Sequence, residues 1–554
     1  MKERKILKNK AYLYITEFFA GMSVMAVELG ASRLLAPYFS SSQIVWTIII
    51  GTIMIAMALG NIYGGRSADK NPDPDKLYGR IVIAAIWIAL IPVVGKYIIM
   101  GISALLIFTI STNFLIVAAF AACMVVFVFP LFLLGTVTPS LVKYTIGSLD
   151  NSGKVVGTLN AANTIGSIIG TFVPTFISIP AVGTSITFLI FAGILLVLAI
   201  IYFVSEKVKS VKAIVATVIF ILCCIFGHNN SFAFWENDLR VEDESIYNYL
   251  QVSETDSSII LSTNALFGVQ SIYKKDKALT GMYYDYAMAA PYMAGIYEKD
   301  EPLRVLILGM GTGTYATQCR RYFGDMYIEG VEIDQKITDL AHDYFELPED
   351  IKVTTYDGRA YLEALNADSK GEMGDITKEQ VEKDKYDVIM VDAYQDITIP
   401  FQMSSVEFFT LVKRQLKSDG VMVVNMNMKS DAEGGINDYL SDTIASVFNE
   451  VYTVDVDKNT NRELFATPCD DIDLMARFSS NLEKEENEEL VSMMTKVYGE
   501  MEKYEPGDRI LTDDKAPVEL LSMKAIDGII QDEVSYYKDI YEREGLDGLI
   551  DELF

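Results

Sequence analysis

Four places in the second half of the chain carry residue types that hold a nucleoside ligand. An apolar stretch at 305–308 breaks into Gly309, Gly311 and Gly313 and then restarts as a helix. Such a turn brings backbone N–H groups and a helix N-terminus close to a nucleotide-like ligand. Glu332 follows about twenty residues later, where a carboxylate accepts hydrogen bonds from ribose hydroxyls.

Further carboxylates end the next two apolar stretches. Asp357 and Gly358 follow one of them, and Asp392 follows the other, while Asp334 lies just beyond Glu332. An acid after the third strand can receive an adenine amino group, and Asp392 would then face the reacting end of the ligand. A G-x-G-x-G turn alone fits a dinucleotide equally well. The combination of acids favours an adenosyl-sulfonium ligand.

The elements that would position these residues alternate between strand and helix. This alternation predicts a Rossmann-like α/β sheet with helices on both faces, in which ligands sit beyond the carboxyl ends of the strands. Before it, 247–274 predicts a small β-hairpin subdomain. The polar insertion at 365–385 is expected to form a surface loop and helix, and the acidic tail after 470 to be mainly helical. The expected strands are "RVLILG", "MYIEGVEID", "IKVTTYD", "YDVIMVDA" and "GVMVVNMN".

The first 230 residues have a different character. They contain 16 Lys/Arg against 8 Asp/Glu, a net charge of +8, whereas the remainder of the chain has a net charge of −36. Several of the apolar runs approach the roughly 20 residues that a helix needs to cross a bilayer. We therefore expect a multi-pass membrane domain of seven or eight helices. The runs lie near 12–36, 43–64, 80–95, 97–112, 114–138, 155–180, 184–204 and 211–227.

Two arguments about membrane topology disagree. The lysine-rich start "KERKILKNK" favours a cytoplasmic N-terminus by the positive-inside rule. Eight spans then return the second half to the cytoplasm, whereas seven spans leave it outside but place the lysines of 205–212 inside. Runs 80–95 and 97–112 decide the count, since they form either a tight hairpin or one span plus an irregular segment. We favour a cytoplasmic second half, because adenosyl ligands are plentiful there.

Ionisable residues occur in or beside the first apolar run. Glu17, Glu28 and Arg33 are costly at such depth, so they pair, line a cavity or take part in function. Elsewhere the five cysteines and the two histidines have no metal-ligand spacing, and no disulfide framework is implied. We therefore expect no metal site.

These motifs together resemble the spermidine/spermine synthases. The glycine turn, "VEID" (331–334), "YDGRAYL" (356–362) and "YDVIMVDAY" (386–394) are similar to that family, as are "SIYNYLQV", "VQSIY" and "MYYDYAMAAP" upstream. The stretches "ELGASRLLAPYF" (28–39), "GGRSADK" (64–70) and "LTDDKAPVE" (511–519) resemble its membrane-fused version, in which a transporter-like helical domain precedes the enzyme.

The resemblance implies aminopropyl transfer from decarboxylated S-adenosylmethionine to a diamine such as putrescine, without a metal. By this resemblance Asp392 is the catalytic aspartate and Tyr283 the tyrosine beside the acceptor nitrogen. Besides the glycine turn and the acids already named, the donor side would include Thr312, Gln270 and Asn248. The acceptor side would include Tyr284, Asp285, Gln395 and Asp396.

Departures from the family pattern keep other reactions open. Thr312 stands where the soluble enzymes carry an aspartate that holds the donor's amine, and Gln395 stands at a second aspartate position unless Asp396 replaces it. The downstream aromatic residue of the family has no counterpart at 461–470. Ordinary S-adenosylmethionine therefore remains a candidate donor. The alternatives are a methyltransferase acting on a membrane-associated substrate and a transporter or sensor with a non-catalytic nucleoside-binding domain.

The expected organisation has four parts: a membrane domain over 1–230, a β subdomain over 231–295, a Rossmann domain over 296–470 and a helical extension over 471–554. The expected partners are the lipid bilayer and a small cationic amine, with no nucleic acid, and a homodimer is compatible with them. The acidic second half suits a cationic acceptor by electrostatic attraction. We expect a cell-membrane protein whose enzymatic part is cytoplasmic.

Overall fold

The computed structural model separates the chain into two compact units. The first comprises Met1–Asn237, Val241–Leu250 and Asn264–Leu266, and the second comprises Asp238–Arg240, Gln251–Thr263 and Phe267–Phe554. The domain boundaries expected at 230, 295 and 470 stay predictions. The structure describes residues 6, 9–107, 110, 113–145, 152–208, 211–228, 232, 238–264, 268–277, 279–371, 384–394, 399–427, 433–457 and 459–553.

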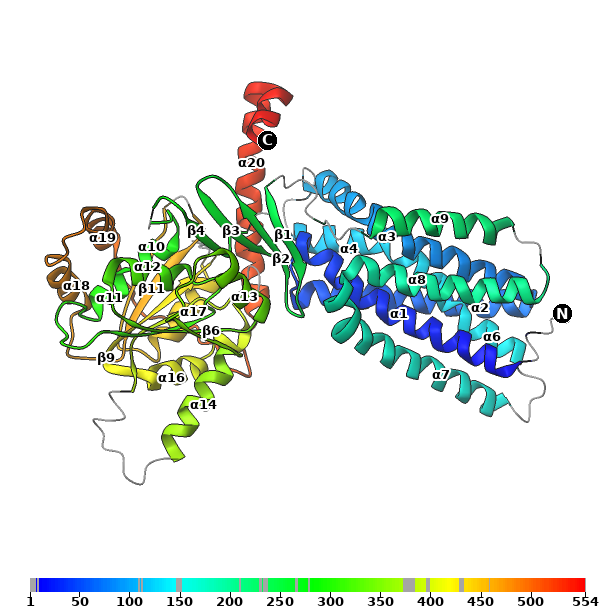
Figure 1. Ribbon diagram of the computed structural model, residues 1–554, viewed down its shortest axis with the longest axis horizontal. Helices are drawn as coiled ribbons and strands as arrows, with labels where there is room; N and C mark the ends of the chain where they lie inside the picture. The colour runs from blue at the N-terminus through cyan, green and yellow to red at the C-terminus, as the bar shows by residue number, and fades with distance from the viewer. Residues whose placement is uncertain are drawn as a thin grey trace. The chain divides into compact units, whose positions relative to one another are not determined.

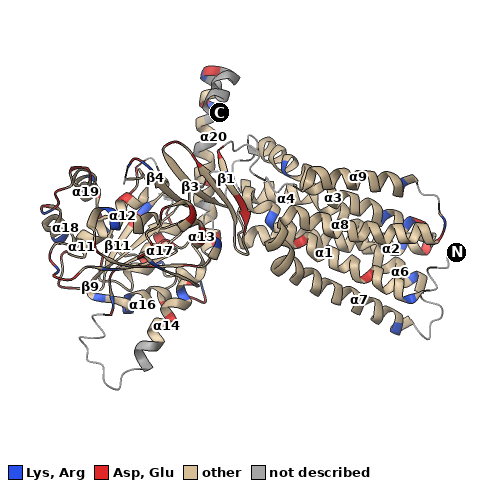
Figure 2. Ribbon diagram, viewed as in Figure 1, with Lys and Arg blue, Asp and Glu red and all other residues tan. Residues whose placement is uncertain are grey.

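The first unit is helical and largely free of charged residues along the middle of its helices (Figures 1 and 2). Among the described residues of this unit, five helical segments are long and apolar enough to cross a membrane, judged by length and composition alone. The elements are α1 (Lys10–Phe39), α2 (Gln43–Lys70), α3 (Pro74–Ile107), α4 (Phe114–Val126), α5 (Val128–Gly135), α6 (Val137–Thr145), α7 (Ser152–Val173), the π-helical turn η3 (Pro174–Ser178), α8 (Ile179–Ser205) and α9 (Val211–Gly227).

Two details revise the expected count of spans. Runs 80–95 and 97–112 are not a hairpin, because α3 passes through Gly95 and Lys96 as one continuous helix. Neither residue stops a helix here, since one glycine costs only about 1 kcal/mol. The apolar segment Ser152–Ser205 is interrupted instead, by η3 and by Gly183, whose φ of 78° is not helical. Helices α4 and α9 are shorter than the five candidate spans.

A small antiparallel-type sheet follows the helices. Its strand order is β1-β2-β3-β4, and β3 pairs with β4 in antiparallel register. The sequence predicted only a hairpin here, because the charged strand β1 lacks an apolar alternation. Two short helices, α10 (Tyr283–Ala287) and α11 (Ala289–Met293), come next. The strands are β1 (Leu239–Glu244), β2 (Tyr249–Glu254), β3 (Ser258–Thr263) and β4 (Ser271–Lys274).

The second unit is built on an eight-stranded mixed sheet with the order β12-β10-β11-β9-β8-β5-β6-β7. The five predicted strands are confirmed as β5 to β9, and they pair in parallel. Three antiparallel strands extend this sheet beyond β9 and were not predicted. The strands are β5 (Arg304–Leu308), β6 (Tyr327–Glu332), β7 (Lys352–Thr355), β8 (Tyr386–Val391), β9 (Leu416–Met426), β10 (Glu450–Asp455), β11 (Arg462–Thr467) and β12 (Glu502–Lys503).

Helices cover both faces of this sheet, as predicted (Figure 1). Successive residues of a strand point to opposite faces, so Val305 and Ile307 enter one buried core while Leu306 and Leu308 enter the other. The first core includes residues of α12 (Thr314–Phe323), α13 (Gln335–Tyr344), α18 (Leu474–Leu482) and α19 (Glu488–Glu500). The second includes residues of α14 (Gly358–Gly371), α16 (Val406–Gln415), α17 (Ile436–Ala445) and α20 (Val518–Leu553).

The extension after 470 is mainly helical, as expected. The insertion predicted at 365–385 begins as α14, and 372–383 lies outside the described residues.

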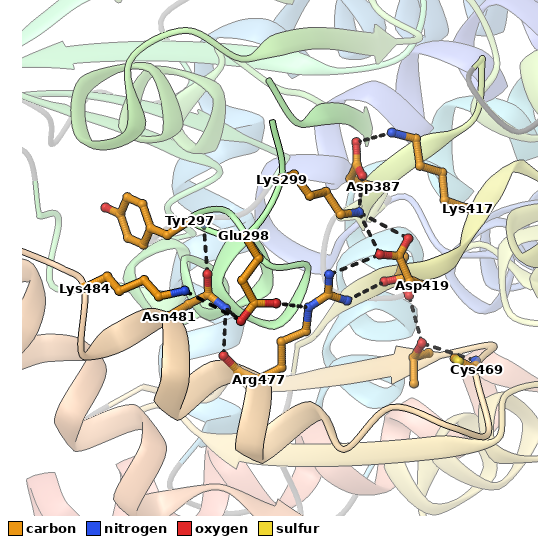
Figure 3. Close-up of polar contacts among 12 residues, drawn as sticks. Tyr297, Glu298, Lys299, Asp387, Lys417, Asp419, Cys469, Arg477, Asn481 and Lys484 are labelled. Carbon is orange, nitrogen blue, oxygen red and sulfur yellow. Dashed lines mark hydrogen bonds and ion pairs between the residues drawn. The ribbon is translucent and has the colours of Figure 1, made fainter. Parts of the chain in front are cut away.

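A network of ion pairs surrounds Asp387 at the start of β8 (Figure 3). Asp387 is fully buried and accepts from Lys299 at 2.5 Å and from Lys417 at 2.8 Å. In the same network, Arg477 of α18 donates to Asp419 at 3.1 Å. A buried carboxylate is stable only with such partners. The network therefore holds one end of β8 and joins α18 to the sheet, while Asp392 follows the other end of the same strand.

Candidate active site

Asp392 lies directly after β8 and is held by two side chains. The hydroxyl of Tyr283 donates to its Oδ2 at 2.7 Å, and the amide of Asn425 donates to its Oδ1 at 2.8 Å. The carbonyl oxygen of Asn425 in turn accepts from Asn461 at 2.7 Å. Because the bond from Asn461 occupies the carbonyl oxygen of Asn425, the amide nitrogen of Asn425 faces the carboxylate of Asp392.

The glycine turn meets Asp392 at the carboxyl edge of the sheet. Gly309 has a φ of 80°, and a Cβ built there would lie 2.5 Å from the backbone oxygen of Asp392. Gly311 has a φ of 57°, and a Cβ there would lie 2.5 Å from the hydroxyl oxygen of Ser271. Only glycine allows both the backbone conformation and the close approach. The turn therefore brings the chain between β5 and α12 against the end of β8.

Glu332 lies at the same turn, as predicted. Its Oε2 accepts from the backbone N–H of Gly311 at 2.9 Å, and its Oε1 accepts from that of Asp334 at 3.1 Å. Burial raises the pKa of Glu332 to about 7, although these backbone donors lower it. A carboxylate in this position can receive hydroxyl groups of a ligand seated on the glycine turn.

Burial dominates the electrostatics of Asp392 as well. Removal from water raises its pKa to about 7, against the lowering effect of the hydrogen bonds from Asn425 and Tyr283. The pKa of Tyr283 is also raised well above its usual range, first by burial and then by the charge of Asp392. Tyr283 therefore remains a proton donor to the carboxylate. Asp392 changes charge near neutral pH, which suits a group that must both hold and accept a proton.

Glu463 is a buried acid that the sequence analysis did not single out. It lies on β11 directly opposite Asn425 of β9, and side chains opposite one another in antiparallel strands share a face. Its side chain has no exposed surface, and within the described part of the chain neither carboxylate oxygen has a hydrogen-bond partner. Burial, and then the charge of Asp392, raise the pKa of Glu463 well above its usual range. Its signal was a lone glutamate in the apolar stretch "ELFAT", in a strand that was not predicted.

Aromatic side chains form the wall beside Asp392. The rings of Tyr283 and Tyr284 lie 4.0 Å apart between centroids, and both side chains are buried. The hydroxyl of Tyr284 donates to the backbone oxygen of Gln270 at 2.7 Å. Ser271 accepts from the backbone N–H of Thr312 at 3.1 Å. The predicted residues Tyr284, Gln270 and Thr312 are thus joined around β4 and the glycine turn.

Three predicted site residues have structural partners in the chain. Asp334 caps α13 by accepting from the backbone N–H of Lys336 at 3.1 Å, and Asp357 accepts from that of Ala360 at 2.8 Å at the start of α14. Asp285 accepts from Thr280, Gly281 and Gln318. Its carboxylate therefore holds the turn before α10 against α12. That arrangement holds the segment that leads into Tyr283, and the substrate contact expected for Asp285 stays a prediction.

The remaining predicted residues divide into three cases. Gly313, with a φ of 86°, and Gly358 begin α12 and α14 at the ligand edge of the sheet. Asn248 belongs to the first unit, where its amide oxygen accepts from Asn264 at 2.7 Å. Gln395 and Asp396 lie outside the described residues.

Three comparisons with known proteins found similar sequences and a similar structure. Residues 291–456 match a family model described as the spermine/spermidine synthase domain. A probable polyamine aminopropyl transferase of Bifidobacterium longum is 52% identical over 366 residues, which cover 63% of this chain and 77% of that protein. A polyamine aminopropyltransferase of Vibrio vulnificus is 26% identical over 54% of this chain and 96% of its own length. The crystal structure of a probable spermidine synthase from Corynebacterium glutamicum matches 49% of this chain and 98% of its own, with a TM-score of 0.34 and 18% identity.

Fold and site thus define a Rossmann-like transferase that uses a co-substrate of the S-adenosylmethionine type. More specifically, the chain belongs to the spermine/spermidine synthase family, the polyamine aminopropyltransferases.

Proposed function

We propose that the chain transfers the aminopropyl group of decarboxylated S-adenosylmethionine to a small di- or polyamine, with putrescine as the first candidate. The observation that carries this proposal is the buried carboxylate Asp392, held by Tyr283 and Asn425 directly beside the glycine turn. The adenosyl moiety would occupy the turn with its ribose on Glu332. The acceptor amine would then reach the donor from the side of Asp392.

A cationic acceptor would supply what the acids of this site lack. Among the described residues, neither of the two buried carboxylate oxygens of Glu463 has a hydrogen-bond partner. Burying an unpaired carboxylate costs free energy, and an ammonium group that donates to Glu463 would offset this cost. Asn425 lies between the two acids, since it contacts Asp392 and is paired with Glu463 across the strands. We infer that the acceptor carries more than one positive charge, so that both acids are compensated when it binds.

The transfer step requires a neutral amine. A free amine is mostly protonated at neutral pH, given a reference pKa near 10.4 for lysine. In the proposed step Asp392 accepts a proton from the acceptor ammonium while Tyr283 keeps the carboxylate in place. The freed nitrogen lone pair forms a bond to the methylene carbon of the aminopropyl group that is attached to the sulfonium. The carbon–sulfur bond breaks with its electron pair on sulfur, which leaves methylthioadenosine.

Thr312 favours a second candidate, methyl transfer from ordinary S-adenosylmethionine. Its hydroxyl oxygen is buried and has no hydrogen-bond partner among the described residues. By the family resemblance, the soluble enzymes carry an aspartate at this position. Without that carboxylate, the donor's amine loses one charge-assisted contact.

The two candidates are separated by products. Purified full-length chain is incubated with either donor and a panel of diamines and polyamines, and the products are identified by mass spectrometry. Aminopropyl transfer yields methylthioadenosine and an acceptor heavier by one aminopropyl group. Production of S-adenosylhomocysteine and a methylated acceptor from the ordinary donor alone would establish the second candidate instead.

We further propose that the first unit lies in a membrane and that the enzymatic unit is cytoplasmic. Its five long apolar helices support the first part. Exposed aliphatic and aromatic side chains on several of them support it further, since a lipid-facing surface needs no polar cover. These include Met54, Leu59, Phe172 and Phe176. The cytoplasmic placement follows from where adenosyl co-substrates occur.

A further inference from the structure

Glu17 is a fully buried carboxylate inside the helical unit. It lies on α1, and two side chains from two other helices donate to the same oxygen, Oε1. Thr138 of α6 donates at 2.5 Å, and Asn163 of α7 donates at 2.9 Å. The second oxygen, Oε2, is buried and has no hydrogen-bond partner among the residues that the structure describes. Three helices therefore converge on one acid, and half of its carboxylate is left unsatisfied.

The surroundings of Glu17 are shaped for this arrangement. Gly21 lies one turn further along α1 on the same face, and a Cβ there would come within 3.0 Å of the Asn163 amide nitrogen. Closer still, it would lie 2.5 Å from the Asn163 backbone oxygen. Gly166 and Gly170 of α7 likewise approach the backbone of α1, and small residues at such contacts let helices pack closely. The close packing brings Asn163 within reach of Glu17.

A cation satisfies Oε2 better than a neutral partner does. A buried ionised acid without a counter-charge is strongly unfavourable, and a protonated one would need an acceptor for its O–H, which Oε2 does not have. Thr138 and Asn163 also retain an oxygen each after donating to Glu17. These oxygens are equal in number to the three N–H donors of a primary ammonium group. Among the described residues no group of three or more His, Cys, Asp or Glu could hold a metal ion.

The two side chains that donate to Glu17 reach the surface of the unit. Glu17 itself has no exposed surface, but Thr138 and Asn163 are each partly exposed. Ionisable residues within apolar helical bundles are costly, and they commonly mark the path of an ion or substrate. We propose that Glu17, Thr138 and Asn163 form a binding site in the helical unit for the ammonium end of an amine. This site is separate in sequence and in its residues from the one at Asp392.

The test counts bound amine. Full-length chain in lipid nanodiscs is equilibrated with radiolabelled putrescine by dialysis, without adenosyl donor. The wild type is expected to bind two molecules per chain. Glu17→Gln keeps an oxygen for Thr138 and Asn163 but removes the charge, so it should bind one. Asp392→Asn with Glu463→Gln should remove the other molecule and leave the Glu17 site.

Matched variants guard against misfolding. Glu28→Gln neutralises a half-buried acid on the same helix and should still bind two molecules. Gly21→Ala leaves the carboxylate but displaces Asn163, and it should weaken the Glu17 site at least several-fold. Binding of methylthioadenosine should be unchanged in Glu17→Gln, which shows that the enzymatic unit is intact. Equal stoichiometry in wild type and Glu17→Gln, whether one or two, would overturn the proposal even if aminopropyl transfer is established. Conversely, loss of transfer in Asp392→Asn alone has no bearing on it.

Discussion

The Asn425 amide donates a 2.8 Å hydrogen bond to the carboxylate of Asp392 across neighbouring strands of the central sheet. Asn425 belongs to β9, and Glu463 faces it from β11. One amide thus connects the parallel part of the sheet, which carries the glycine turn, with its antiparallel extension. The predicted acid Asp392 is hydrogen-bonded to Asn425, and the unpredicted acid Glu463 is paired with the same residue across the strands.

Replacing Asp392 by Asn tests its role as the proton acceptor. The substitution keeps the shape but removes the charge, and general acid–base contributions are typically about 10²–10⁴-fold. We expect turnover to fall by that factor while methylthioadenosine still binds in calorimetry. Tyr283→Phe should cost less, because it removes a hydroxyl group and not a charge. Near-wild-type turnover in Asp392→Asn would contradict the proposed step.

The pH dependence of acceptor use follows from the same group. The pKa of Asp392 in the free enzyme is raised to about 7, so the carboxylate is protonated below that pH. Because the ionised form must hold the ammonium, kcat/KM for the acceptor should rise with pH up to about 7 and then level off. Initial rates at low acceptor concentration measure this profile. An unbroken rise, or a fall, between pH 6 and 8 would exclude Asp392 as the controlling group.

Glu463 should make the unliganded protein less stable as the pH rises. Its pKa is higher in the folded state than the 4.5 of an exposed glutamate, so the folded chain binds more protons above pH 4.5. Stability then falls with pH until the folded pKa is passed. In Glu463→Gln this part of the slope should be lost. Thermal unfolding of both proteins from pH 5 to 9 measures the difference, and parallel curves would show that Glu463 titrates normally.

Two alanine variants distinguish the close backbone contact at Gly309 from the effect of a positive φ alone. Gly324 also has a positive φ, 69°, but a Cβ there meets nothing within 4 Å. Gly324→Ala should therefore show only backbone strain, about 1–3 kcal/mol. Gly309→Ala adds the collision with the backbone after β8, so it should be less stable than Gly324→Ala and lose adenosyl-ligand binding. Chemical denaturation and calorimetry report the two effects, and equal losses in both variants would show that the close approach is unimportant.

The proposed cytoplasmic placement of the enzymatic unit can be tested at a single exposed position. Ala364 on α14 is exposed, so Ala364→Cys is accessible to thiol reagents from its own side. An impermeant maleimide applied to intact cells should leave this cysteine unmodified and label it only after lysis. The same chain without the new cysteine corrects for the five native ones. Labelling in intact cells would place the enzymatic unit outside.

The parallel half of the fold was predictable because its signals are local. Strands β5 and β8 contain short apolar runs, and Gly309, Glu332 and Asp392 lie at strand ends that must meet at one edge. The antiparallel strands lacked such signals, since β11 carries the buried Glu463 and reads as an interrupted apolar run. The backbone partners of Asp285 and Asp334 had no such local signal. A carboxylate near a strand end or helix start can cap backbone groups or bind a ligand, and its place in the sequence does not distinguish the two roles.

The antiparallel extension also has a consequence for synthesis of the protein. The glycine turn, Glu332 and Asp392 occur within one continuous stretch of chain, but Asn425 and Glu463 come from strands that follow it, and Asn461 directly precedes the second of these strands. Contacts between distant segments form slowly, because loop-closure entropy must be overcome first. A chain emerging from the ribosome can therefore complete the glycine turn before the strand that carries Glu463 exists. Acceptor recognition would be the last part of the site to mature.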